Sequence, residues 1–162
     1  EGGNYTQLKL NLKCLKKIER FWEFSENEKI SYASTLKTRG NSLFKAGYTT
    51  RAVRAYKLGI RLLDGSVSVA PAADCSSYKA NPDAQNLFIT LLLNASLCLL
   101  RLVNEQQSSS SSYLSLANST KAVRTDQLMR PCIAACQKAI HMDPNNAKAW
   151  FRMAQSGLRC SA

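Results

Sequence analysis

The chain has 162 residues, of which 45% are hydrophobic and only four are proline, a composition that suits one domain with a real core. Its 22 Lys and Arg residues outnumber 11 Asp and Glu residues, so the net charge is +11. This excess indicates an acidic partner, and composition alone leaves open nucleic acid, a membrane surface or an acidic peptide. The longest uncharged apolar run, about 14 residues around 87–100, is too short to cross a membrane, so we expect no membrane partner.

The cysteines favour reduced thiols over disulfides. None of the six forms a C-x-x-C pair, and Cys98, Cys132 and Cys136 fall on apolar helical faces, where a free Cys behaves as a small hydrophobe. Cys132 and Cys136 are spaced i, i+4 and could hold a metal, but the single histidine, His141, lies off that face. We therefore predict no metal site, no cofactor and a cytoplasmic location, with the nucleus as a second location.

Residues 1–24 are predicted to belong to a different unit from the rest of the chain. Leu8, Leu10 and Leu12 alternate with polar residues as in a strand, and helical spacing then follows to about Phe24. A lone strand cannot stabilise itself. We therefore expect 1–24 to be the remnant of a preceding domain and a linker helix, which a start without Met also suggests, and 25–162 to be a helical domain.

Helical periodicity and end signals divide the remainder into five helices. Ser25, followed by early acids, is a helix start, and Gly47 ends that helix. Small residues and prolines predict a loop over 65–82, and the Ser-rich stretch EQQSSSSSYLSLANSTK predicts a second loop over 105–124. The expected helices cover about 26–46, 50–63, 83–104 and 125–142, the last with an alternative start at Pro131, and a fifth begins near 147.

Helix pairs at a near-constant period indicate an all-α solenoid. The stretch KAIHMDPNNAKAWFRMA resembles the tetratricopeptide (TPR) repeat, with Ala139, Pro144, Trp150 and Ala154 at its consensus spacing. The first copy fits through Gly40, Phe44, Gly47, Ala52 and Tyr56, where small residues allow close helix approach and aromatics fill the gap. About three repeats result, and the middle one is stretched by two inserts of about 20 residues each relative to the 34-residue period.

Five polar residues fall on the inner helices of these repeats. Lys37 and Asn41 share one face of the first helix because they are spaced i, i+4, and Lys148 and Arg152 repeat that spacing on the fifth. Asn94 lies on the third, amid apolar residues, where a polar group is costly unless it has a hydrogen-bond partner or a function. The inner helices of successive repeats line one groove, so all five can converge. Their donors and charges suit a carboxylate.

The pattern K-x-x-x-N, then N, then K-x-x-x-R resembles the dicarboxylate clamp of co-chaperone TPR domains. Those domains hold the C-terminal EEVD of heat shock protein 90 or heat shock protein 70. The resemblance implies that Lys37, Asn41, Asn94, Lys148 and Arg152 bind such a peptide. It implies a peptide-binding co-chaperone module with no catalytic residues of its own.

The entry segment ERFWEFSENEKISYASTLKTRGNSLFKAG is similar to the junction between the isomerase and TPR domains of FKBP-type immunophilins. Trp22, Glu23, Glu28 and Lys29 carry that likeness. The related aryl-hydrocarbon-receptor-interacting group shares the L-L-L-N stretch that ends at Asn94. The resemblance implies an upstream prolyl isomerase-like domain in the parent protein, whose active-site residues are absent from this sequence, so we expect no such activity in this chain.

Three other functions compete with peptide clamping. The net charge would suit a basic nucleic-acid-binding repeat, but the basic residues are scattered and do not interleave with aromatics. A scaffold that binds a client protein without a chaperone tail is the second alternative, and it is compatible with the clamp. Catalysis is disfavoured because the chain has one histidine, no Ser–His–Asp set and no Gly-rich phosphate loop.

Overall fold

A computed structural model of the chain describes residues 23–64, 82–108 and 117–160. In these ranges the chain forms five helices in sequence order, and the all-α TPR solenoid expected from the sequence is confirmed. The helices are α2 (Glu26–Lys45), α3 (Thr49–Asp64), α5 (Pro82–Ser108), α6 (Ala117–Met142) and α7 (Ala147–Cys160).

Local signals account for both ends of α2. The Ser25 hydroxyl accepts a hydrogen bond from the Glu28 amide at 3.4 Å, and the Glu28 carboxylate accepts one from the Ser25 amide at 3.0 Å. This capping box satisfies free amides at the helix start. At the other end Gly47 has a φ of 82°, a left-handed conformation that glycine adopts without steric cost. The predicted start and end of the first helix are therefore confirmed within one residue.

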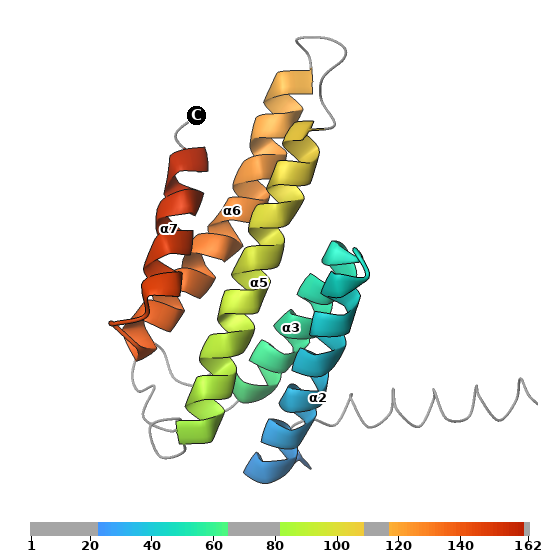
Figure 1. Cartoon of the computed structure of the whole chain (residues 1–162), viewed down its shortest axis with the longest axis vertical. Helices are drawn as coiled ribbons and strands as arrows, with labels where there is room; N and C mark the ends of the chain where they lie inside the picture. Colours follow the sequence, from blue (N-terminus) through green and yellow to red (C-terminus); the bar gives the residue numbers. More distant parts are fainter. Residues whose placement is uncertain (1–22, 65–81, 109–116, 161–162) are drawn as a thin grey trace, which may run out of the picture.

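Helix α5 forms the centre of the solenoid. It contacts α2, α3, α6 and α7, and each helix also packs against the next along the chain (Figure 1). Leu91, Cys98 and Val103 on α5 are almost fully buried. The expectation that its apolar stretch is too short to cross a membrane is wrong by length and composition, since 24 residues, Pro82–Glu105, meet both criteria, but 67% of the apolar window is buried by the rest of the protein. Its composition is thus that of a core helix.

The second predicted loop, over 105–124, is wrong in extent. Helix α5 continues to Ser108 and α6 already begins at Ala117. Gln106 and Gln107 are good helix formers. The i, i+4 ion pair in which Arg101 Nε lies 2.9 Å from Glu105 Oε1 also supports the extension of α5 past its predicted end.

Pro131 lies inside α6 instead of starting it. Proline inside a helix removes one hydrogen bond and costs about 3 kcal/mol. Met129 and Cys132, on either side of it, are fully buried, and burial of such side chains offsets that cost. Of the predicted strand and linker helix of residues 1–24, residues 1–22 lie outside the described residues. The same holds for the predicted loop over 65–82 apart from Pro82, where α5 begins, so both stay predictions.

Contacts between repeats are mostly apolar, and an ion pair adds to them. The Lys138 amine lies 2.6 Å from the Asp64 carboxylate and 5.1 Å from the centre of the Phe88 ring. It therefore joins α6 to both α3 and α5, although a half-exposed pair of this kind stabilises a fold by about 1 kcal/mol at most. Cys98, Cys132 and Cys136 are buried free thiols, in agreement with their predicted place on apolar faces.

We predict that Gly40→Ala destabilises the domain. A Cβ at Gly40 would come within 2.8 Å of carbon atoms in the Tyr56 ring, and overpacking of this kind costs about 1–3 kcal/mol. Gly157→Ala is the matched control, because a Cβ at Gly157, also inside a helix, meets nothing within 4 Å. The control should be neutral or stabilising by up to about 1 kcal/mol. Urea unfolding of both variants measures the difference, and equal stabilities would contradict the close packing.

Candidate functional site

Three helices supply the five predicted site residues. Helix α2 carries Lys37 and Asn41, α5 carries Asn94, and α7 carries Lys148 and Arg152. Asn41 and Lys148 are exposed, and the other three are partly buried. Because α5 contacts both α2 and α7, the three helices form one continuous surface.

The side chain of Asn41 lies at the junction between α2, α3 and α5. Its Oδ1 accepts a hydrogen bond from the Tyr56 hydroxyl at 2.7 Å and another from Asn94 Nδ2 at 3.2 Å. An amide oxygen has two acceptor positions, so both are occupied. These two bonds orient the amide and leave the Asn41 NH₂ group as the part available to a ligand. The structure thus brings Asn41 and Asn94 into direct contact.

Arg152 extends this set of polar contacts from α5 to α7. Its guanidinium donates a hydrogen bond to the Leu93 carbonyl, directly before Asn94. Partial burial lowers the pKa of Arg152 from its ordinary value, with a smaller opposing effect from the nearby thiols of Cys136, Cys132 and Cys98. Arginine stays protonated in proteins nonetheless. The site therefore contains a cation that has lost part of its hydration and gained only a neutral carbonyl.

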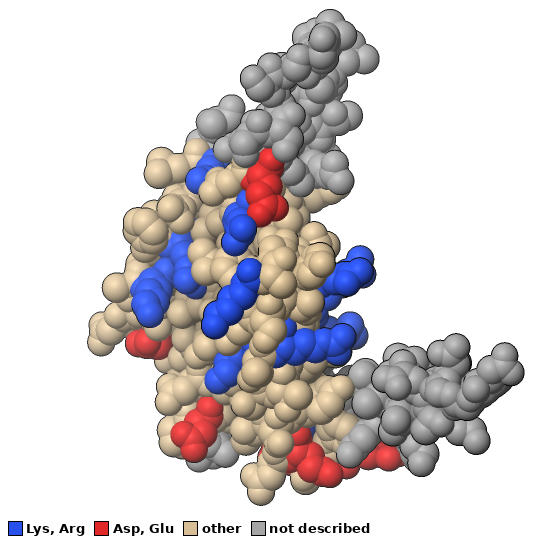
Figure 2. Space-filling view, turned by 45° about the vertical axis from the view of Figure 1, so that its right-hand side comes forward, with Lys and Arg blue, Asp and Glu red and all other residues tan. Residues whose placement is uncertain are grey.

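Lys37 and Lys148 lie on the same helical faces, one turn from Asn41 and Arg152 respectively. Among the described residues, neither lysine donates a hydrogen bond to the Asn41–Asn94 pair. Within the described ranges, no Asp or Glu forms an ion pair with Lys37, Lys148 or Arg152. In Figure 2, Lys and Arg side chains spread over the middle of one face, while Asp and Glu side chains lie mainly toward its lower and upper ends. The arrangement offers donors and positive charge, which suits an anion.

A buried thiol and a buried hydroxyl lie next to the backbone of α7 at Arg152. Cys132 Sγ lies 3.0 Å from Ser156 Oγ, and the Ser156 hydroxyl donates to the Arg152 carbonyl at 2.7 Å. Burial raises the pKa of Cys98 to about 11, so this thiol is protonated at neutral pH. In the part of the chain that the structure describes, no three His, Cys, Asp or Glu side chains come together as a metal site would need.

Sequence reasoning did not assign a role at the site to Tyr56. It placed Tyr56 in the gap between helices, where the ring does pack against Gly40, but not the hydrogen bond from its hydroxyl. Burial raises the pKa of Tyr56 to about 12, so the hydroxyl remains a donor. The available signal was a Tyr, not a Phe, on an otherwise apolar face, because a buried hydroxyl needs a partner.

We predict that Tyr56 and Asn41 are energetically coupled. Tyr56→Phe and Asn41→Ala should each destabilise the domain, and the double variant should cost less than their sum, by about 0.5–1.5 kcal/mol, since one hydrogen bond is lost only once. Denaturant unfolding of the four proteins completes the cycle. Asn145→Ala, in the turn before α7, is the control and should add independently to Tyr56→Phe. A coupling energy of zero would show that the hydroxyl does not hold the amide.

Known proteins resemble the chain in both sequence and fold. It is 27% identical over 149 residues to peptidyl-prolyl cis-trans isomerase FKBP4 of Homo sapiens and 28% identical to that of Bos taurus. Each alignment covers 92% of this chain but only 26% of the relative, so the chain spans about a quarter of these proteins. No family model matches the sequence.

A solved structure shares the fold. The C-terminal TPR-containing domain of a putative FK506-binding protein from Plasmodium falciparum matches with a TM-score of 0.56 and 18% identity. The match covers 85% of this chain and 71% of that domain. The sequence relatives and the fold together agree with the resemblance found in the entry segment. The chain is therefore similar in sequence to part of FKBP-type proteins, and it shares the fold of a TPR-containing domain.

Proposed function

We propose that this domain is a co-chaperone module whose groove binds the acidic C-terminal EEVD tail of heat shock protein 90 or heat shock protein 70. The observation that supports this most is the continuous set of contacts from Asn41 through Asn94 and Leu93 to Arg152. It joins the first, second and third repeats at one surface. Lys37 and Lys148 then stand on either side as cations without an acidic partner among the described residues.

The electrostatics of Arg152 favour a carboxylate ligand. The guanidinium already bears part of the cost of burial, so an incoming carboxylate gains a charged partner without paying that cost again. A charge-assisted hydrogen bond contributes about 1.5–3 kcal/mol, and ordering a flexible tail offsets much of the sum. We therefore expect micromolar affinity, which corresponds to about −8 kcal/mol.

The side chains of Asn41 and Asn94 would determine the orientation of a bound peptide. Asn41 directs its NH₂ group outward because its oxygen is occupied by Tyr56 and Asn94. The Asn94 oxygen is not used in the bond to Asn41, so it can accept a hydrogen bond from the peptide backbone. A tail would then be held at its end by charge and along its backbone by amides. We assign no isomerase activity to the groove.

The test is to titrate a fluorescent peptide that ends in EEVD with a free carboxylate. Lys148→Glu should weaken binding about ten- to hundredfold, because it removes one charge-assisted bond and adds repulsion. Lys57→Glu is the matched control: it makes the same charge change at an exposed position on α3. The control should bind within about twofold of the wild type at 0.15 M salt, where distant charges are screened.

A second peptide separates the terminal carboxylate from general acidity. The same sequence with an amidated C-terminus keeps its Glu and Asp side chains but loses one negative charge at the end. It should bind at least about tenfold more weakly. Equal affinity for the two peptides, or equal losses in Lys148→Glu and Lys57→Glu, would overturn the proposed function.

A further inference from the structure

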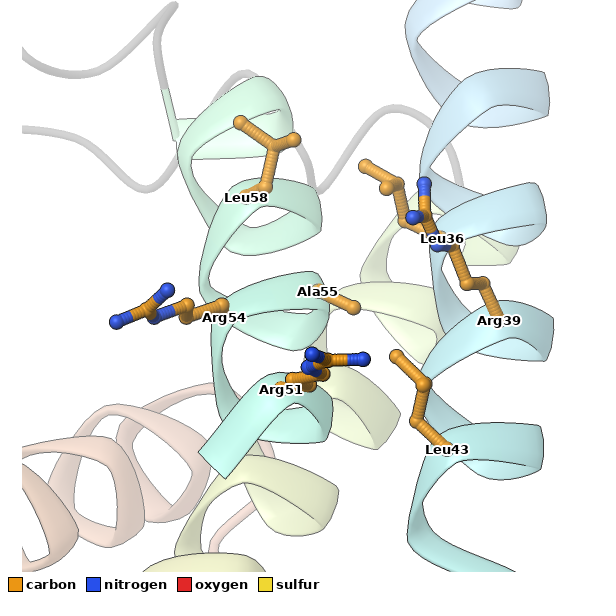
Figure 3. A pocket seen from close by; sticks show the side chains of 7 residues that line it. All are labelled: Leu36, Arg39, Leu43, Arg51, Arg54, Ala55 and Leu58. Carbon is orange, nitrogen blue, oxygen red and sulfur yellow. The ribbon is translucent and has the colours of Figure 1, made fainter. Parts of the chain in front are cut away.

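A second groove lies between α2 and α3. It has a volume of about 400 Å³ and is lined by Leu36, Arg39, Leu43, Arg51, Arg54, Ala55 and Leu58 (Figure 3). Its floor is apolar: Leu36 and Ala55 are buried, and Leu43 and Leu58 are partly buried. An opening with an apolar floor of this kind fits one or two apolar side chains of a ligand.

The rim of this groove is basic. Arg39, Arg51 and Arg54 are all exposed. Figure 3 shows Arg51 extending toward α2 and Arg39 lying beside Leu36, whereas Arg54 points away from the gap between the two helices. Within the described ranges none of the three forms an ion pair, and Arg51 stacks on the Tyr48 ring with its guanidinium carbon 5.4 Å from the ring centre. Among the described residues that line the groove, none is Asp or Glu. Guanidinium groups that face no carboxylate can each bind one in a planar fork.

The groove is separate from the proposed tail site. Successive residues of a helix are about 100° apart. Arg39 is two residues from both Lys37 and Asn41, a rotation of about 200°, so it lies on nearly the opposite side of α2. A peptide in one groove therefore does not block the other. Because no residue is shared, the second groove does not depend on the tail-binding proposal.

We propose that the α2–α3 groove binds an acidic peptide segment with apolar side chains from another protein. An apolar side chain would lie on Leu36 and Leu43, with flanking carboxylates bound by Arg39 and Arg51. The groove accepts an internal segment, because its apolar floor and separated arginines do not require a chain terminus. This is a binding activity distinct from capture of a C-terminal tail.

Charge complementarity selects this occupant over the others. A second copy of the chain brings a net charge of +11 and is repelled. Residues 1–22 are also basic, with four Lys and one Arg against two Glu, so the arginines of the groove repel this segment as well. A nucleic acid strand would bind through stacking surfaces and a charged track, whereas the floor here is aliphatic. An acidic–apolar peptide matches both the rim and the floor.

The test uses a synthetic 12-residue peptide in which Glu alternates with Leu and Phe, with both ends blocked so that it has no terminal carboxylate. We expect Arg39→Glu combined with Arg51→Glu to weaken its binding at least about tenfold. The matched control is Lys45→Glu with Lys57→Glu, which makes the same charge change on the same two helices outside the groove. That control and Lys148→Glu should each change affinity less than about threefold.

Three results would overturn the proposal: equal losses in the groove variant and its control, a larger loss in Lys148→Glu, or equal binding of a Glu-only peptide or a single-stranded oligonucleotide. Backbone amide NMR should show shifts at the groove residues and not around Asn94. If circular dichroism shows that the variant with Arg39→Glu and Arg51→Glu does not fold, Arg39→Gln with Arg51→Gln gives the same comparison. Failure of EEVD binding alone would leave these results unchanged.

Discussion

The packing of α5 against four other helices is the constraint on which the rest of the structure depends. This helix contacts α2, α3, α6 and α7, and removal of its apolar surface from water is the main source of stability, at about 25 cal/mol per Å². Its rotation is fixed by side chains such as Leu91 and Val103, which are fully buried. The same rotation places Asn94 next to α2 and the Leu93 carbonyl next to α7. The core therefore determines the geometry of the groove.

Packing and polar contacts meet in one residue, Tyr56. Its ring packs against Gly40, where a Cβ would overlap it, and its hydroxyl orients Asn41. The close approach of α2 and α3 therefore sets the position of the hydrogen bond that fixes the Asn41 amide. Asn94, which would be costly in an apolar helix without a partner, gains one in the same place. A substitution that loosens this contact should change the site as well as the stability.

The features that the sequence predicted well are local or periodic. The start of α2 follows from the Ser25–Glu28 capping box, and the contact between Asn41 and Asn94 agrees with the repeat register. The predicted end of α5, the predicted start of α6 and the alternative start at Pro131 were wrong, because tertiary packing overrides local propensity. The contacts of the Tyr56 hydroxyl and the Arg152 guanidinium could not be predicted, because they depend on how two packed helices are rotated about their axes.

Helix α2 contributes to both of the proposed anion sites. Asn41 on this helix bonds to Asn94 of α5, whereas Arg39 lines the groove with α3. The two surfaces differ in chemistry: the first combines amides with cations, and the second has arginines beside an aliphatic floor. A terminal carboxylate binds best where several hydrogen-bond donors converge. An acidic segment with apolar side chains also needs an apolar surface on which those side chains can pack. Selectivity between such ligands follows from the shape and apolar area of each groove, since the charge is common to both.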